Sequence, residues 1–85
     1  PDADLEKVAA AVIPCGFGNA GQTCISTQRI LTVGADTYGN LLDVLKPKVA
    51  AIKFGDQLDP ATQMGPMVRE ADAVRVEQWI NDAVA

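Results

Sequence analysis

Apolar residues recur at helical spacing in three stretches of the chain. In residues 2–15 they mark one helix face, at the i, i+3, i+4, i+7 and i+8 positions: Leu5, Val8, Ala9, Val12 and Ile13. Residues 35–52 carry a second stripe: Tyr38, Leu41, Leu42, Leu45, Val49 and Ile52. Residues 69–85 carry a third, whose expected buried side is Val76, Trp79, Ile80, Ala83 and Val84. The pattern therefore predicts three amphipathic helices.

The first residues of each stretch favour a helix N-terminus. Side chains that cap a helix or suit the positive end of its dipole stand at each start: Asp2 and Asp4, Asp36 or Thr37, and Glu70 and Asp72. Two prolines conflict with the periodicity, because a proline inside a helix removes one hydrogen bond and clashes with the preceding turn. Pro14 predicts a kink or break near Val12–Ile13, and Pro47 predicts a bend or split in the second helix.

One short segment has the character of a β-strand. Residues 29–33, RILTV, are rich in branched apolar side chains and end at Gly34, as a strand buried on both faces of a parallel sheet would. Residues 53–67 hold two Gly and two Pro without a period and predict an extended loop. A lone strand cannot satisfy its own backbone groups. We therefore expect an α/β fold with about three helices and one short parallel-type strand, as a piece of a larger domain.

Composition and charge narrow the function classes. The chain has 85 residues and a net charge of −4, and its seven basic residues are scattered, so nucleic acid is not an expected partner. No apolar run is long enough for a membrane span, so no membrane association is expected. The chain has no histidine, which removes Cys–His dyads, Ser–His–Asp triads and His-containing zinc sites. We expect no metal site, and a reducing, cytoplasmic setting is the default.

A glycine-rich run, CGFGNAGQTC, occupies residues 15–24 and contains a G-x-G-x-x-G at Gly16, Gly18 and Gly21. A dinucleotide-binding loop needs a strand before this motif and a helix after it. Here a helical stretch precedes the motif, and a segment rich in Thr, Ile and Val follows it. We therefore expect the glycines to end a helix and to let the backbone turn toward Cys24, with no cofactor-binding residue in the chain.

The two cysteines differ in their surroundings. Cys15 follows Pro14 in an apolar stretch and is expected to be a small buried hydrophobe. Cys24 stands in a polar stretch led by glycine, and loops on a rigid frame often carry a nucleophile. Spacing alone leaves both a structural and a catalytic role open for Cys24. A disulfide between the two is not expected in a reducing compartment.

Residues 17–30, FGNAGQTCISTQRI, resemble the catalytic-cysteine segment of the aldehyde dehydrogenase superfamily. The pattern F-x-N-x-G-Q-x-C, with Arg five residues later, is matched by Phe17, Asn19, Gly21, Gln22, Cys24 and Arg29. The resemblance extends through PDADLEKV, KFGDQLDPATQMGPMV and VEQWINDAV, and so covers essentially the whole chain in order. One departure is Gln57, where the family often has proline, and it affects the rigidity of the loop rather than the chemistry.

The resemblance implies a specific reaction. Cys24 would attack an aldehyde carbonyl, the thiohemiacetal would pass a hydride to NAD or NADP, and the thioester would be hydrolysed or transferred to coenzyme A. The Cys24 backbone N–H would contribute to the oxyanion hole. Asn19, Gly21 and Gln22 would shape the loop beside the nucleophile, and Arg29 would anchor the loop or pair with an acid.

The resemblance also implies what the chain lacks. The family's general-base glutamate and its nucleotide-binding Rossmann domain come from earlier segments, so residues 1–85 would be a partial catalytic domain. Such a piece would bind no cofactor and show no turnover alone, while the parent enzyme would act on a small-molecule aldehyde as a homo-oligomer. The alternative is a small helical module that self-associates through its apolar stripes and uses Cys24 only structurally.

Overall fold

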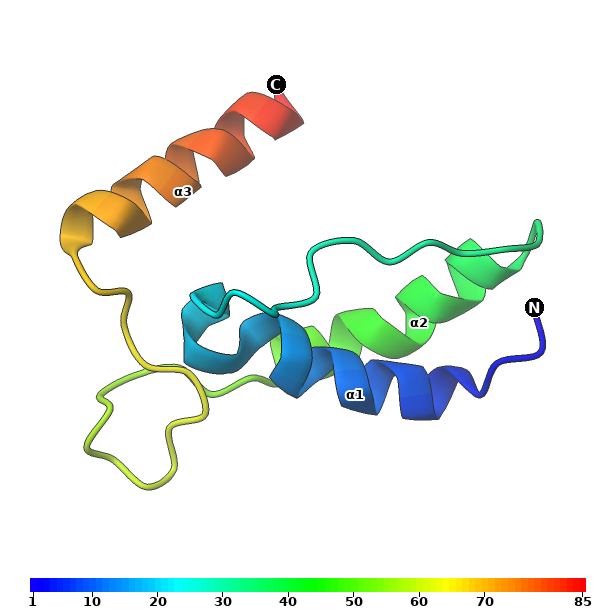
Figure 1. Ribbon diagram of the computed structural model, residues 1–85, viewed down its shortest axis with the longest axis horizontal. Coiled ribbons are helices and arrows are strands. Elements are labelled where there is room, and N and C mark those ends of the chain that lie inside the picture. The colour runs from blue at the N-terminus through cyan, green and yellow to red at the C-terminus, as the bar shows by residue number, and fades with distance from the viewer.

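The computed structural model describes residues 1–85 and contains helices joined by irregular segments. The elements are α1 (Leu5–Phe17), the short 3₁₀ helix η1 (Gly18–Gly21), α2 (Thr37–Ala50) and α3 (Glu70–Val84). Figure 1 shows α1 and α2 lying side by side, whereas α3 stands away from them after a long loop. The three helices predicted from the apolar spacing are therefore confirmed.

The contact between α1 and α2 holds the small core of the chain. Its two buried apolar side chains are Ala9 on α1, which is 0% exposed, and Leu41 on α2, which is 6% exposed. An ion pair between Glu6 and Lys48 joins the two helices at the surface, with 3.1 Å between Oε2 and Nζ. This pair of helices forms the frame from which the glycine-rich run departs.

The caps of α1 and α2 use different chemistry. The Asp4 carboxylate accepts a hydrogen bond from the Lys7 backbone N–H at 3.2 Å, as an N-cap residue does. Asp36 is the N-cap residue of α2, but its side chain makes no capping bond. The Thr37 hydroxyl instead donates to the Val33 carbonyl oxygen at 2.8 Å and so fastens the start of α2 to the preceding segment.

Neither proline breaks its helix: of the expected kink or break in α1 and bend or split in α2, the break and the split do not occur. Pro14 and Pro47 each lie in the last turn of a helix that continues past them. Their carbonyl oxygens still accept hydrogen bonds, from the Gly18 and Ala51 N–H groups respectively. A proline inside a helix lacks the one hydrogen bond that its own N–H would donate, and the bonds that remain after it carry each helix to its end.

The strand expected at residues 29–33 does not form. The segment has no regular secondary structure, and Leu31 and Val33 are 90% and 68% exposed. The only strand-type pairing in the chain is an isolated parallel bridge between Phe54 and Met64. A strand requires a neighbour to accept and donate its backbone hydrogen bonds, and no other segment of these residues lies beside 29–33 in that way.

The face of α3 that was expected to be buried is mostly exposed. Val76 is half-buried, but the other members of the stripe are exposed: Trp79, Ile80, Ala83 and Val84. No contact joins α3 to another helix. Helical spacing identifies which face of a helix is apolar, but burial also needs a second surface, and these 85 residues do not supply one for α3.

A cluster of one acid and two arginines fixes the start of α3. The Asp72 carboxylate is buried and accepts hydrogen bonds from Arg69 Nε at 3.0 Å, Arg69 Nη2 at 3.3 Å and Arg75 Nη1 at 2.9 Å. The hydrogen bond from Arg69 lowers the pKa of Asp72 below its ordinary value, with further lowering from the charges of both arginines and opposition from desolvation.

The lowered pKa of Asp72 predicts a loss of stability in acid. Its contribution is complete above the ordinary carboxyl value of 3.8 and disappears as the pH falls through the lower folded-state value. We expect Asp72→Asn to flatten the pH dependence of unfolding below about pH 4, measured by urea denaturation. Asp82→Asn is the matched control, because Asp82 accepts only from the neutral Gln78 amide. An equal effect of both substitutions would contradict the assignment.

Candidate active site

After α1 the backbone makes a left-handed turn through three consecutive residues. Asn19 has φ 54° and ψ 36°, Ala20 has φ 53° and ψ 35°, and Gly21 has φ 74°. Asparagine and glycine tolerate this region, but an alanine there costs roughly 1–2 kcal/mol. Such strain persists only where surrounding contacts hold it, and it is common near functional groups. The turn reverses the chain immediately before Cys24.

Hydrogen bonds between Asn19 and Gln22 close this turn. The Asn19 carbonyl oxygen accepts from both the backbone N–H and the side-chain Nε2 of Gln22, each at 3.0 Å. In return, Asn19 Nδ2 donates to the Gln22 carbonyl oxygen at 3.3 Å. The Ser26 hydroxyl donates to the Gly21 carbonyl oxygen at 3.3 Å and ties the next residues to the same turn. Three of the residues expected to shape the loop therefore lie together in the structure.

Cys24 lies in a second, tight turn. The Ser26 N–H donates to the Thr23 carbonyl oxygen at 3.0 Å, so residues 23–26 form one turn with Cys24 at its second position. Ser26 is buried beneath this turn, and the Thr27 N–H donates to the Cys15 carbonyl oxygen at 3.0 Å, which attaches the segment to α1. The Cys24 thiol is free and exposed. The Cys24 thiol therefore lies on the exposed side of a turn that the hydrogen bonds of Ser26 and Thr27 hold in place.

Cys15 is exposed and free, so the expectation that it is a buried hydrophobe was wrong. It lies in the last turns of α1, on a part of the helix that α2 does not cover. Arg29 is also exposed and takes part in none of the four ion pairs of the chain, so the expected pairing with an acid is not observed.

The chain has no obvious metal or nucleotide site of its own. No group of three or more His, Cys, Asp or Glu residues could hold a metal ion. The glycine run covers the end of α1 and all of η1 and leads into an irregular segment, so no α-helix begins directly after it as in a phosphate-binding loop. No helix is long and apolar enough to span a membrane. The two thiols of the chain, Cys15 and Cys24, are both free and exposed.

The long loop between α2 and α3 is folded back on itself. The Lys53 backbone N–H donates to Gln63 Oε1 at 2.9 Å, and the Met64 N–H donates to the Lys53 carbonyl oxygen at 3.1 Å. The Gly55 N–H donates to the Met64 carbonyl oxygen at 3.2 Å. These bonds close the loop at its base and direct the following residues toward η1.

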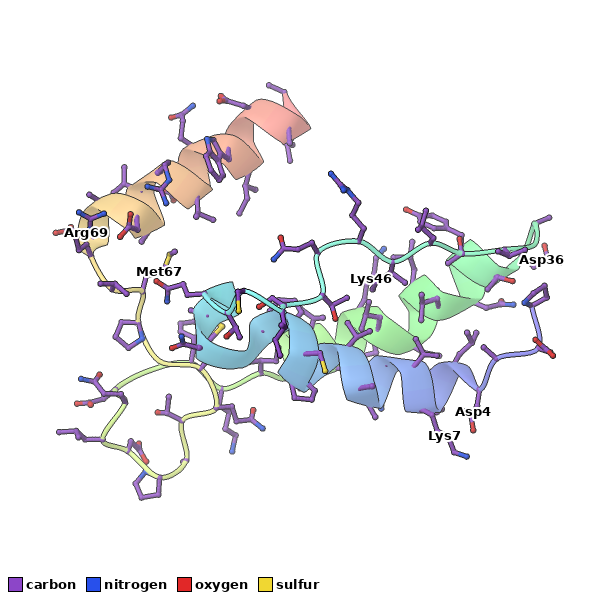
Figure 2. The ribbon with its side chains drawn as sticks, viewed as in Figure 1. Asp4, Lys7, Asp36, Lys46, Met67 and Arg69 are labelled. Atoms are coloured by element: carbon purple, nitrogen blue, oxygen red, sulfur yellow. The ribbon has the colours of Figure 1, made fainter.

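A side-chain hydrogen bond then joins this loop to the turn before Cys24. The Val68 N–H donates to Gln22 Oε1 at 3.1 Å, across 46 positions of sequence. Figure 2 shows Met67, the preceding residue, on the segment that passes η1, and Arg69 at the start of α3. No spacing or composition signal in the sequence indicates this contact, because its two partners belong to motifs separated by a whole helix and loop.

Comparisons with known proteins agree with the resemblance. The model of the aldehyde dehydrogenase family matches residues 1–85. The chain is 45% identical over 83 residues to 3-sulfolactaldehyde dehydrogenase of Priestia aryabhattai, covering 98% of this chain and 17% of that protein. It is 39% identical over 83 residues to an NADP(+) succinate-semialdehyde dehydrogenase of Schizosaccharomyces pombe, covering 98% and 16%.

A solved structure of a protein described as a semialdehyde dehydrogenase also resembles this chain. The crystal structure of a protein described as a putative methylmalonate-semialdehyde dehydrogenase from Sinorhizobium meliloti, complexed with NAD, superposes with a TM-score of 0.94 and 34% identity. The match covers 99% of this chain and 17% of that one. The chain thus spans about a sixth of the length of these relatives.

Proposed function

Because the chain belongs to the aldehyde dehydrogenase family, we propose that it is the nucleophile-bearing segment of an NAD- or NADP-dependent enzyme that oxidises a small aldehyde to a carboxylic acid. Cys24 is the proposed nucleophile. The observation that supports this most directly is the exposed, free thiol on the turn of residues 23–26, held by hydrogen bonds on both sides of it.

The proposed chemistry begins at the Cys24 sulfur. The thiolate attacks the carbonyl carbon, a C–S bond forms, and the carbonyl electron pair moves to oxygen to give a thiohemiacetal. The Cys24 backbone N–H donates to no backbone carbonyl in the chain and is thus free to stabilise that oxygen. Oxidation to the thioester requires a hydride acceptor, which NAD(P)⁺ supplies when it is bound. Water or coenzyme A then releases the acyl group and restores the thiol.

Asn19, Gly21 and Gln22 are proposed to shape the loop rather than to contact substrate. Their hydrogen bonds join them to one another, to Ser26 and, from Gln22, to the Val68 N–H. Gly21 suits the turn because its φ of 74° lies where side chains with a Cβ are strained. This arrangement fixes where the chain emerges from the left-handed turn, two residues before the thiol.

We propose that cofactor binding lies in other segments of the complete protein, by which we mean the polypeptide of the relatives' length. Residues 1–85 are then a partial catalytic domain, and the nucleotide-binding domain and the general base lie outside it. The segment alone would have no turnover. We also propose a cytoplasmic homo-oligomer for the complete protein.

A second candidate function is a self-associating helical module in which Cys24 has no catalytic role. The exposed apolar side chains of α3 and of residues 30–33 favour it, because an uncovered apolar surface promotes association. The two candidates differ in what they require of the thiol. If Cys24 is a catalytic nucleophile, its thiol should react faster than an ordinary exposed thiol. If the chain is a non-catalytic module, the two exposed cysteines should react at similar rates.

Alkylation by iodoacetamide tests the proposal. In the complete protein near pH 7 we expect Cys24 to react at least about tenfold faster than Cys15, because a catalytic nucleophile is more reactive than a thiol with no catalytic role. Cys15 is the internal control, since both thiols are exposed in the chain. In urea the two rates should become equal. Equal rates in the folded protein would favour the module and count against the enzyme.

A further inference from the structure

The Gln22 side chain joins two segments of the chain by hydrogen bonds, and this connection has no role in the chemistry proposed above. Its Nε2 donates to the Asn19 carbonyl oxygen at 3.0 Å, and its Oε1 accepts from the Val68 N–H at 3.1 Å. Every other side-chain hydrogen bond in the chain joins residues ten positions apart or fewer. Gln22 is therefore the one side chain that ties the turn before Cys24 to a distant segment by a hydrogen bond.

The segment at the other end of this connection is itself anchored on both sides. On its N-terminal side, Met64 pairs with Phe54 and closes the base of the loop. On its C-terminal side, Arg69 is fastened to the buried Asp72 by two hydrogen bonds. Val68 lies between these anchors, so its N–H is a fixed point against which the turn can be held.

The Cys24 turn needs such a fixed point. Its backbone leaves α1 through three left-handed residues and enters a segment without regular structure, so neither a helix nor a sheet sets its direction. The Thr27–Cys15 backbone bond holds it toward α1, but only after the nucleophile. Before the nucleophile, the bond from Val68 to Gln22 is its tie to the rest of the chain.

We propose that Gln22 is a positioning residue that couples the Cys24 turn to the segment of residues 64–69 through the Val68 N–H. The bond sets the direction from which the sulfur meets the carbonyl carbon, and this inference rests on the proposed function of Cys24. Displacement of a reacting atom by about 1 Å can slow a reaction about a hundredfold, so loss of the bond acts on the rate of the chemical step.

Two substitutions separate the bonds that Gln22 makes. Gln22→Met keeps the length of the side chain and removes both side-chain bonds. Gln22→Glu keeps an oxygen that accepts from Val68 and loses the donor to Asn19. Gln78→Met is the matched control, because it makes the same chemical change and removes a side-chain hydrogen bond, to Asp82 Oδ1, on α3 and outside the loop that carries Val68.

The measurements are made on the complete protein as kcat and KM for aldehyde oxidation, with kcat taken at the plateau of its pH profile so that a change in thiol ionisation does not enter. We expect Gln22→Met to lower kcat by about tenfold to a hundredfold with KM changed less than about threefold. Gln22→Glu should recover most of the loss. Gln78→Met should keep kcat within about twofold of the unaltered protein.

Three outcomes would contradict the coupling of the Cys24 turn to residues 64–69 through Gln22. Retention of kcat by Gln22→Met, or a kcat for Gln22→Glu as low as that of Gln22→Met, would overturn it, as would an equal loss in Gln78→Met. Thermal unfolding of each variant shows whether a loss is a folding defect: the proposal requires Gln22→Met and Gln78→Met to unfold at similar temperatures. Failure of the proposed function itself is seen separately, as turnover that survives Cys24→Ser.

Discussion

Replacement of Cys24 by serine is expected to abolish aldehyde oxidation, with kcat of the complete protein lowered by at least about a thousandfold. A hydroxyl is almost entirely protonated near neutral pH and is a much weaker nucleophile than a thiolate. An oxygen adduct would also give an ester in place of the more reactive thioester. The measurement is the formation of NADH or NADPH with an aldehyde, supported by the mass of the acyl-enzyme intermediate, which should disappear.

Cys15→Ser is the control for this prediction. Both cysteines are free and exposed in the chain, so the two substitutions make the same chemical change at similarly accessible positions. Cys15→Ser should leave kcat within about twofold, because its side chain lies on α1 and takes no part in the proposed reaction. Turnover that survives in Cys24→Ser, or an equal loss in both variants, would exclude Cys24 as the nucleophile.

Leu41→Ala is expected to have the largest effect on folding, lowering the free energy of unfolding by about 2–4 kcal/mol. Leu41 and Ala9 are the two buried apolar side chains of the chain, so truncation at Leu41 removes apolar burial and leaves a cavity where α1 meets α2. That loss is a large fraction of the stability of a small domain. Urea denaturation followed by circular dichroism measures it as a lower midpoint with an unchanged slope.

Leu58→Ala makes the same chemical change at a residue that is 84% exposed. Its effect on the free energy of unfolding should lie within about 0.5 kcal/mol, because surface truncations create no cavity. A cost at position 58 equal to that at position 41 would show that the contact between α1 and α2 is not what stabilises the chain.

The helices could be predicted from the sequence because their signals are local. A helix forms its hydrogen bonds between residues four apart, so the apolar spacing and the capping carboxylate of Asp4 already contain the information that places it. The motif around Cys24 is likewise contiguous, and it indicated the aldehyde dehydrogenase family that the comparisons then confirmed. The prolines misled because each removes a single backbone bond, and whether a helix continues past that loss depends on its remaining bonds and contacts.

Burial and strand pairing could not be predicted in the same way. Residues 29–33 have strand composition, but a strand exists only with a partner alongside it, and no such partner is present here. Cys15 and Trp79 lie in stretches whose apolar character suggested burial, and both are exposed. In each case the local pattern was identified correctly, whereas the second surface that would cover it is a property of the tertiary structure.

The sequence by itself determined the three helices, the family and the identity of the candidate nucleophile, because each depends on neighbours within a few positions. The tertiary structure alone decided how that nucleophile is held. The left-handed turn at residues 19–21, the bond from Val68 to Gln22 and the arginine cluster around Asp72 all depend on the path of the folded chain. A hydrogen bond across 46 positions forms only after α2 and the loop behind it have brought the two ends together, so no local pattern encodes it.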